Sequence, residues 1–264
     1  MKKRTSMTGF LTKIKLALVL MSCMWFSLAC NDENAPDCFQ NAGPLERIEV
    51  ELPEFSRITV FENLNLVLKQ GAEQKVELES GRFLLNDLVA KVEGDRLLVS
   101  NDNGCNLFRE FGISTVYVTA PNITQIRSST GLLISSDGPL SYPALSLVSE
   151  SFVNPDSETT DGSFDLQFDN TAIEIFVNGI AYFKLSGRSP RLDITIAAGD
   201  SRIETDDLMA DQVIIDHRGT NDVIVNPQLG IEGVIRGYGD VISLNRPATI
   251  AVEELFEGRL IFRD

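Results

Sequence analysis

Four glycines in the second half of the chain stand twenty residues apart, and each lies between two short apolar segments. They are Gly179, Gly199, Gly219 and Gly239. The surrounding sequence repeats as well, because residues 237–240 resemble residues 219–222 at a spacing of 18. A repeat of about twenty residues that holds two or three short strands is typical of a β-solenoid, in which every repeat forms one coil.

Apolar and polar residues alternate with a period of two along most of the chain, which indicates strands with one buried face. The clearest cases are residues 58–60, 64–66, 76–79, 97–99, 116–118, 164–168, 173–175, 192–196 and 222–225. The one helix-like patch is short and runs from about Phe83 to Val89. We therefore predict an all-β, single-domain β-solenoid that spans residues 48–264.

The repeat also assigns roles to residues at the predicted corners between strands. Glycine permits a positive φ where the chain turns, and an aspartate that follows can accept hydrogen bonds from local backbone N–H groups. The predicted turn residues are Gly131, Gly179, Gly199, Asp200, Gly219, Asp222, Gly237, Gly239 and Asp240. The aspartates could instead line up as catalytic carboxylates or as a Ca²⁺ ladder, but each stands where a turn needs a capping side chain.

The first thirty residues have the pattern of an export signal. Five basic residues precede an apolar run from Leu16 to Ala29, and Cys30 follows at once. This arrangement resembles a bacterial lipoprotein signal, which implies cleavage after residue 29 and acylation of Cys30. We expect a signal peptide at 1–29, a tether at 30–47 and a lipid anchor in the cell envelope, in the outer membrane or at the cell surface. A plain signal peptide, a single membrane anchor and processing at Cys23 are the alternatives.

Charge limits the partners of the mature chain. Cleavage after residue 29 removes five of the 23 basic residues and none of the 38 acidic ones, which leaves a formal charge of −20. Such a surface repels nucleic acid and anionic lipid headgroups at long range. No glycine-rich loop opens a helix, so we expect no nucleotide and no other cofactor. The expected partners are the membrane, through the lipid anchor, and a protein or cell-surface polymer.

Two cysteines, Cys38 and Cys105, remain once Cys23 is removed and Cys30 is acylated. An even pair in an oxidising compartment favours a disulfide, which in the chain-entropy model stabilises by about 4 kcal/mol for a loop of this length. A metal site would need more ligands than this chain offers, with His217 as the one histidine. We predict that this disulfide fastens an atypical cap, residues 48–110, ahead of repeat coils at 111–264.

No set of residues makes a convincing catalytic site. His217 lies between charged residues and is expected at the surface, and no Gly-x-Ser-x-Gly motif supplies a nucleophile. We predict no catalytic and no metal-binding residue, and a binding or adhesion role. The alternatives are a carbohydrate-active β-helix enzyme, a lyase or hydrolase that would need two carboxylates in one groove, and a structural protein of the envelope.

Several phrases resemble a known bacterial family. They are residues 55–60, 66–71, 116–123, and 237–240 with 245–247. They are similar to the family described as putative auto-transporter adhesin, head GIN domain, over about residues 48–262. The resemblance implies a right-handed parallel β-helix of the pectin-lyase-like kind, with no catalytic set and a role in adhesion. The expectation is therefore a lipid-anchored, acidic β-solenoid that binds rather than catalyses.

Overall fold

The structure is a computed structural model that describes residues 37–107, 110–152 and 159–263. Its secondary structure is almost entirely β, which confirms the predicted all-β class. The two helical elements are 3-10 turns of three residues each, η1 (Asp37–Phe39) and η2 (Leu85–Asp87). The helix-like patch at 83–89 therefore forms only η2, and Leu88 already belongs to the next strand.

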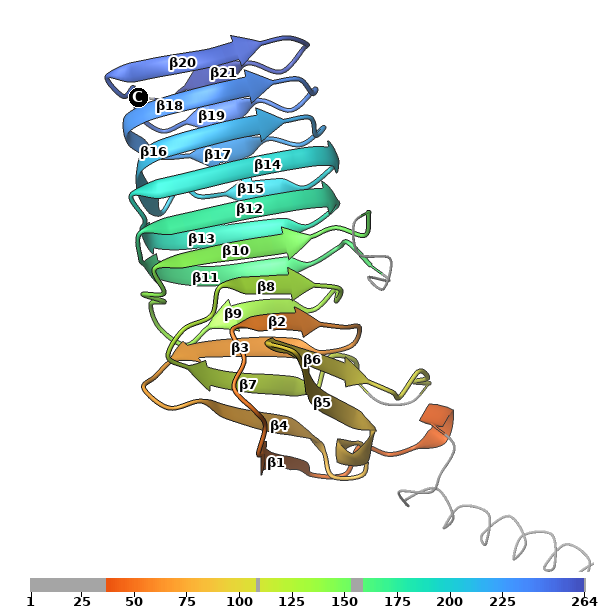
Figure 1. Ribbon diagram of the computed structural model, residues 1–264. Coiled ribbons are helices and arrows are strands. Elements are labelled where there is room, and N and C mark those ends of the chain that lie inside the picture. Colours follow the sequence, from red (N-terminus) through yellow and green to blue (C-terminus); the bar gives the residue numbers. More distant parts are fainter. Residues whose placement is uncertain (1–36, 108–109, 153–158, 264) are drawn as a thin grey trace, which may run out of the picture.

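The strands form two sheets, here called sheet A and sheet B (Figure 1). In order across sheet A they are β1 (Leu45–Val50), β4 (Lys75–Gly81), β7 (Thr115–Ala120), β3 (Asn65–Gln70), β9 (Leu133–Ser136), β11 (Ser163–Asp169), β13 (Tyr182–Arg188), β15 (Arg202–Glu204), β17 (Val223–Val225), β19 (Val241–Ser243) and β21 (Leu260–Phe262).

Sheet B contains, in order, β5 (Leu88–Glu93), β6 (Arg96–Asn101), β2 (Arg57–Val60), β8 (Gln125–Ser128), β10 (Ala144–Ser149), β12 (Ala172–Gly179), β14 (Arg191–Gly199), β16 (Leu208–His217), β18 (Pro227–Ile235) and β20 (Thr249–Glu254).

From β8 onward the chain alternates between the sheets, and each strand pairs in parallel with the strand two positions further on. One strand from each sheet therefore makes one turn of what we call the parallel stack, residues 125–262 (Figure 1). The glycine repeat is visible in the register, because Gly179 lies opposite Gly199 on the next turn. A twenty-residue repeat is thus one turn of this stack.

Apolar residues of both sheets point into the space between them, as the period of two requires. Ile173, Ile175 and Val177 of β12 are at most 1% exposed, and the same alternation continues in β14. In sheet A, Phe164 and Phe183 lie opposite each other in register, and their rings stack with centroids 4.5 Å apart. Neighbouring turns therefore share one continuous apolar core.

The two ends of the molecule are built differently. All antiparallel pairing in the described residues lies near the N-terminal end, where β4 pairs with β1 and β7, and β5 pairs with β6. At the other end, β20 and β21 each pair with one strand only and leave a parallel edge (Figure 1).

The predicted disulfide is present. Cys38 and Cys105 are bonded, with their Cα atoms 4.6 Å apart and 67 residues between them in sequence. The bond joins η1 to the loop between β6 and β7. The predicted signal peptide and the acylation site Cys30 lie outside the described residues.

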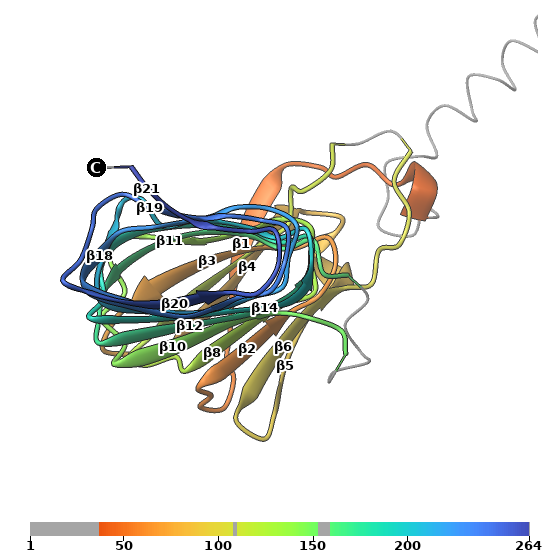
Figure 2. The same cartoon turned by 90° about the horizontal axis from the view of Figure 1, so that it is seen from above.

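The turns of the molecule gather at two edges, which are visible when the molecule is viewed along the stack (Figure 2). The BA edge contains the segments that lead from sheet B to sheet A: residues 61–64, 102–107, 110–114, 129–132, 150–152, 159–162, 180–181, 200–201, 218–222, 236–240 and 255–259. The AB edge contains the segments in the other direction, including residues 170–171, 189–190, 205–207 and 244–248. In both views η1 lies on the side of the BA edge.

Candidate binding site

Predicted turn glycines form a column along the BA edge. The carbonyl oxygens of Gly179, Gly199 and Gly219 each accept a hydrogen bond from a backbone N–H of the next turn, at 2.8 to 3.2 Å. A Cβ on Gly199 or Gly237 would overlap the carbonyl oxygen of the glycine below it. These positions therefore need glycine because neighbouring turns approach so closely.

The reason predicted for these glycines was mostly wrong. Within the described residues Gly199 has a positive φ, +94°, whereas the other five predicted turn glycines do not. At Gly131 and Gly179 an added Cβ would instead meet the side chains of Asp161 and Thr160. The chain can turn at these corners without left-handed backbone, so contact between turns rather than φ restricts the residue type.

The three predicted aspartates connect one turn to the next. Asp222 Oδ1 accepts a hydrogen bond from the backbone N–H of Asp240 at 3.0 Å, and Asp240 Oδ1 accepts one from Arg259 N–H at 2.8 Å. Asp200 Oδ1 accepts a hydrogen bond from the Thr220 hydroxyl at 2.6 Å. Their partners therefore lie on the following turn rather than in the same corner, where the sequence had placed them.

His217 is not at the surface, and that expectation was wrong. Its side chain is 0% exposed, and its Nδ1 accepts a hydrogen bond from the backbone N–H of Gly219 at 3.3 Å. Its Nε2 has no hydrogen-bond partner in the described residues. Burial lowers the pKa of His217, and the backbone groups of Asn221 and Gly239 together with the charges of Asp222 and Asp240 oppose this effect only in part. The imidazole is therefore neutral and belongs to the core.

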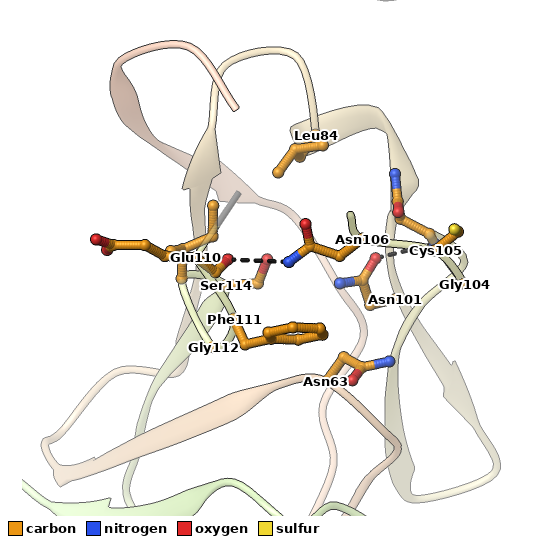
Figure 3. Close-up of a pocket in the computed structure, with 12 residues that line it drawn as sticks. Asn63, Leu84, Asn101, Gly104, Cys105, Asn106, Glu110, Phe111, Gly112 and Ser114 are labelled. Carbon is orange, nitrogen blue, oxygen red and sulfur yellow. Dashed lines mark hydrogen bonds between the residues drawn. The ribbon is translucent and has the colours of Figure 1, made fainter. Parts of the chain in front are cut away.

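A polar pocket lies at the N-terminal end of the BA edge, beside the disulfide (Figure 3). Its volume is about 90 Å³, which is enough for several water molecules. The lining is rich in amides and is completed by one exposed aromatic ring and one carboxylate. The lining residues are Asn63, Leu84, Asn101, Asn103, Gly104, Cys105, Asn106, Glu110, Phe111, Gly112, Ile113 and Ser114.

The pocket wall is held by hydrogen bonds between segments that are distant in sequence. The Asn103 side chain donates to Gln40 Oε1 at 2.8 Å and to Asp87 Oδ2 at 3.0 Å. Gln40 in turn donates to the Phe83 carbonyl at 2.9 Å. With the Cys38–Cys105 bond, these contacts fix the loop between β6 and β7 against η2 and the start of the described chain.

Amide groups both donate and accept hydrogen bonds, so this pocket suits a hydroxyl or amide group of a ligand. Asn63 stands at its rim in left-handed backbone, with φ +63° and an exposed side chain. This pocket was not predicted from the sequence, although the three asparagines in residues 101–106, next to Cys105, indicate a polar site. No cluster of three metal-ligating side chains occurs in the described chain.

The outer face of sheet B has a separate cluster of arginines close to the N-terminal end. Arg57 and Arg96 lie opposite each other in register, and Arg127 is on the neighbouring strand. Arg127 pairs with buried Glu150 at 2.5 Å, whereas Arg96 donates to the neutral oxygens of Thr59 and Gln125. Burial and the charges of Arg57 and Arg127 lower the pKa of Arg96. Arg57 is paired with Asp95 as well, so two of these three arginines have a carboxylate partner.

Residues 54–247, more than half of the chain, match the family described as "Putative auto-transporter adhesin, head GIN domain". The chain belongs to this family. The resemblance inferred from residues 55–60, 66–71, 116–123 and 237–247 is thus confirmed. No curated protein matches this chain.

Solved structures support the same fold. A putative adhesin from Bacteroides fragilis is similar over 83% of this chain and 97% of its own, with 17% identity and a TM-score of 0.69. A putative lipid binding protein from Parabacteroides distasonis and a putative adhesin from Parabacteroides merdae have TM-scores of 0.57 and 0.56, at 13% and 14% identity. In both comparisons the similarity covers 83% of this chain, and it covers 97% and 96% of the other chain. At such identities the likeness concerns the fold.

The family associates the chain with adhesins and with the cell envelope or surface. Neither helical element of the described residues could cross a membrane.

Proposed function

We propose that this protein is a lipid-anchored binding module of the cell envelope, that its stack is a right-handed parallel β-helix, and that it acts by adhesion rather than catalysis. The amide-lined pocket beside the disulfide is the observation that carries the proposal. It offers hydrogen bonds without a nucleophile and base in contact, and its volume suits one end group of a cell-surface polymer.

The arrangement of the aspartates argues against the alternative of a carbohydrate-active enzyme. Glycosidases need two carboxylates that face one substrate-sized groove. Asp200, Asp222 and Asp240 are each engaged with the next turn of the stack. Their hydrogen bonds support a role in fastening turns together.

Binding is tested with the acylated mature protein and polysaccharides purified from a bacterial envelope. Asn63→Gly removes the rim amide and keeps left-handed backbone accessible. Asn122→Gly is the matched control, because Asn122 is equally exposed but lies outside the pocket. We expect at least a tenfold loss of affinity in Asn63→Gly and none in the control. If the two variants bind with equal affinity, the pocket is not the binding site.

The anchor is tested separately. We expect Cys30→Ser to stop incorporation of labelled fatty acid and to release the protein from membranes. If Cys30→Ser remains membrane-bound and Cys23→Ser is released, processing occurs seven residues earlier in the chain.

A further inference from the structure

Exposed aromatic side chains gather on one side of the molecule. In the described residues, the five that are most exposed are between 47% and 87% accessible: Phe39, Phe111, Phe152, Tyr238 and Phe256. Four of them lie on the BA edge, and Phe39 follows Cys38, which is bonded to Cys105 of the same edge. Single exposed apolar residues are ordinary on protein surfaces, but four of the five on one edge, with Phe39 beside it, form a pattern.

Exposed aliphatic residues extend the pattern. Leu107, Ile180 and Leu255 are on the BA edge and are 57% to 63% exposed. Phe152 and Phe256 follow β10 and β20, which are five strand positions apart in sheet B, or about 24 Å. The exposed apolar side chains thus lie near both ends of the BA edge, and the polar turns at 200–201 and 218–222 separate the two groups.

The chemistry of these side chains favours lipid over a polymer. Sugar rings stack on flat aromatic faces, whereas leucine and isoleucine offer no such face. Phe, Leu, Ile and Tyr together are the side chains with which proteins enter the boundary between headgroups and acyl chains. Arg236 is in the same turn as Tyr238, and Arg259 is in the same turn as Phe256. Both are exposed and lie 3.4 to 3.7 Å from a carboxylate, Asp216 and Glu254 respectively, and a guanidinium group has enough donors to contact a phosphate oxygen as well.

The tether gives a reason for the lipid to meet this edge. Cys38 is fixed to the BA edge by its bond to Cys105. Cys30 is eight residues earlier in sequence, a separation that extended chain spans with at most about 28 Å. An acyl chain on Cys30 would therefore keep the N-terminal end of this edge within about 28 Å of the bilayer surface.

We propose that the BA edge lies on the surface of the bilayer that holds the lipid anchor, with the parallel stack oriented along the membrane. This inference rests on the proposed acylation of Cys30. In this orientation the AB edge faces away from the lipid and both broad sheet faces are free. The asparagine-lined pocket is then near the headgroups, where the membrane-proximal part of an envelope polymer lies.

Tryptophan fluorescence tests this orientation, because the only tryptophan, Trp25, is in the predicted signal peptide. The mature acylated protein is reconstituted in phosphatidylcholine–phosphatidylethanolamine vesicles that contain brominated lipid. Phe256→Trp and Phe152→Trp place a probe on the BA edge. Leu229→Trp is the control, since Leu229 is 56% exposed and lies in β18 close to the AB edge.

We expect brominated lipid to quench the two BA-edge probes at least twofold more than the control. Equal quenching of all three, or stronger quenching at position 229, would overturn the proposal. The proposal would also be overturned if the fluorescence of the probe at 256 responded to envelope polysaccharide but not to lipid. This edge would then be a polymer-binding surface.

These measurements distinguish a failure of the proposed acylation from a failure of the proposed lipid-facing edge. Fatty-acid incorporation reports on acylation alone. If the mature chain carries no acyl group, the same probes are measured with vesicles added to the unacylated protein. Blue-shifted, quenched emission at position 256 but not at 229 would then retain the lipid-facing edge while the proposed anchor is lost.

Discussion

At several glycines of the BA edge, a backbone oxygen of the neighbouring turn occupies the position that a Cβ atom would take. At Gly237 this oxygen belongs to Gly219, and at Gly239 it belongs to Asn221. Both glycines have φ values that other residues adopt without strain. Their restriction to glycine therefore comes from a second segment of chain, and any larger residue must push two turns apart.

Gly237→Ala tests this contact. The methyl group should force the turn at residues 236–240 away from the turn below it and lower the free energy of unfolding by about 1–3 kcal/mol. The control is Gly104→Ala, since Gly104 has open space at its Cβ position and no positive φ. Urea denaturation measures both variants, and an equal loss of stability in the two would contradict the stacking explanation.

His217 should make the free energy of unfolding depend on pH near and below pH 6.5. No other type of side chain ordinarily titrates in this range. Burial lowers its pKa in the folded state, whereas in the unfolded chain it is about 6.5. The unfolded chain then binds more protons below that value. Stability is full above about pH 6.5 and falls as the pH decreases toward the folded pKa, by up to about 1.4 kcal/mol per pH unit.

Urea midpoints at pH 7.5 and pH 5.5 measure this effect. His217→Gln removes the titrating group, and since the chain has one histidine, the difference between the two pH values should shrink in this variant. Asp222 and Asp240 are the charged groups that act on His217. An unchanged pH dependence in His217→Gln would assign it to groups other than this imidazole.

At the scale of elements, side chains fasten one turn to the next beyond the backbone pairing of the strands. Asp222 and Asp240 form successive steps of a ladder, each accepting a backbone N–H from the turn that follows. The strands they precede, β17 and β19, are only three residues long. Short strands have few backbone hydrogen bonds, so each side-chain bond contributes a larger share of the contact between turns.

Asp222→Ala should therefore lower the free energy of unfolding by about 1–3 kcal/mol, because it leaves the N–H of Asp240 without its acceptor. Asp206→Ala, in an exposed turn of the AB edge, is the comparison and should have little effect. Thermal unfolding of both variants gives the difference. If Asp206→Ala is the more damaging change, the ladder does not stabilise these turns.

The element pattern was largely readable from the sequence. Alternation at 164–168, 173–175 and 192–196 predicted strands that the structure contains, because a half-buried strand has a period of two. The partners of each element were harder to predict. The polar pocket beside the disulfide unites residues 63, 84, 101, 103–106 and 110–114, and His217 lies between charged sequence neighbours yet faces the core. Such features depend on which turns are adjacent in space.

At the scale of the whole molecule, the parallel stack is a series of interchangeable turns. A deletion of residues 200–219 would join Gly199 to Thr220 and remove one strand from each sheet, β15 and β16. β17 could then pair with β13, and β18 with β14, because successive turns repeat the same register. We expect this shortened protein to fold.

The measurement is far-UV circular dichroism with thermal unfolding, in which the shortened protein should show a β spectrum and a cooperative transition. Deletion of residues 200–209 is the contrasting variant. It removes half a turn, which would place the rest of β16 in the wrong sheet and exchange the sheets for every later strand. A folded half-turn deletion, or an unfolded whole-turn deletion, would show that the turns are not equivalent units.

The disulfide also decides how the molecule responds to mechanical tension. A pull on the N-terminal segment reaches Cys38 and divides there, one path running through residues 39–44 to β1 and the other through Cys105 to the loop between β6 and β7. β1 is an edge strand with one partner, β4, and would peel away first if it carried the whole force. The covalent bond instead passes the force to a strand of each sheet at once, so an adhesive contact under flow would strain the interior of the molecule rather than strip its outermost strand.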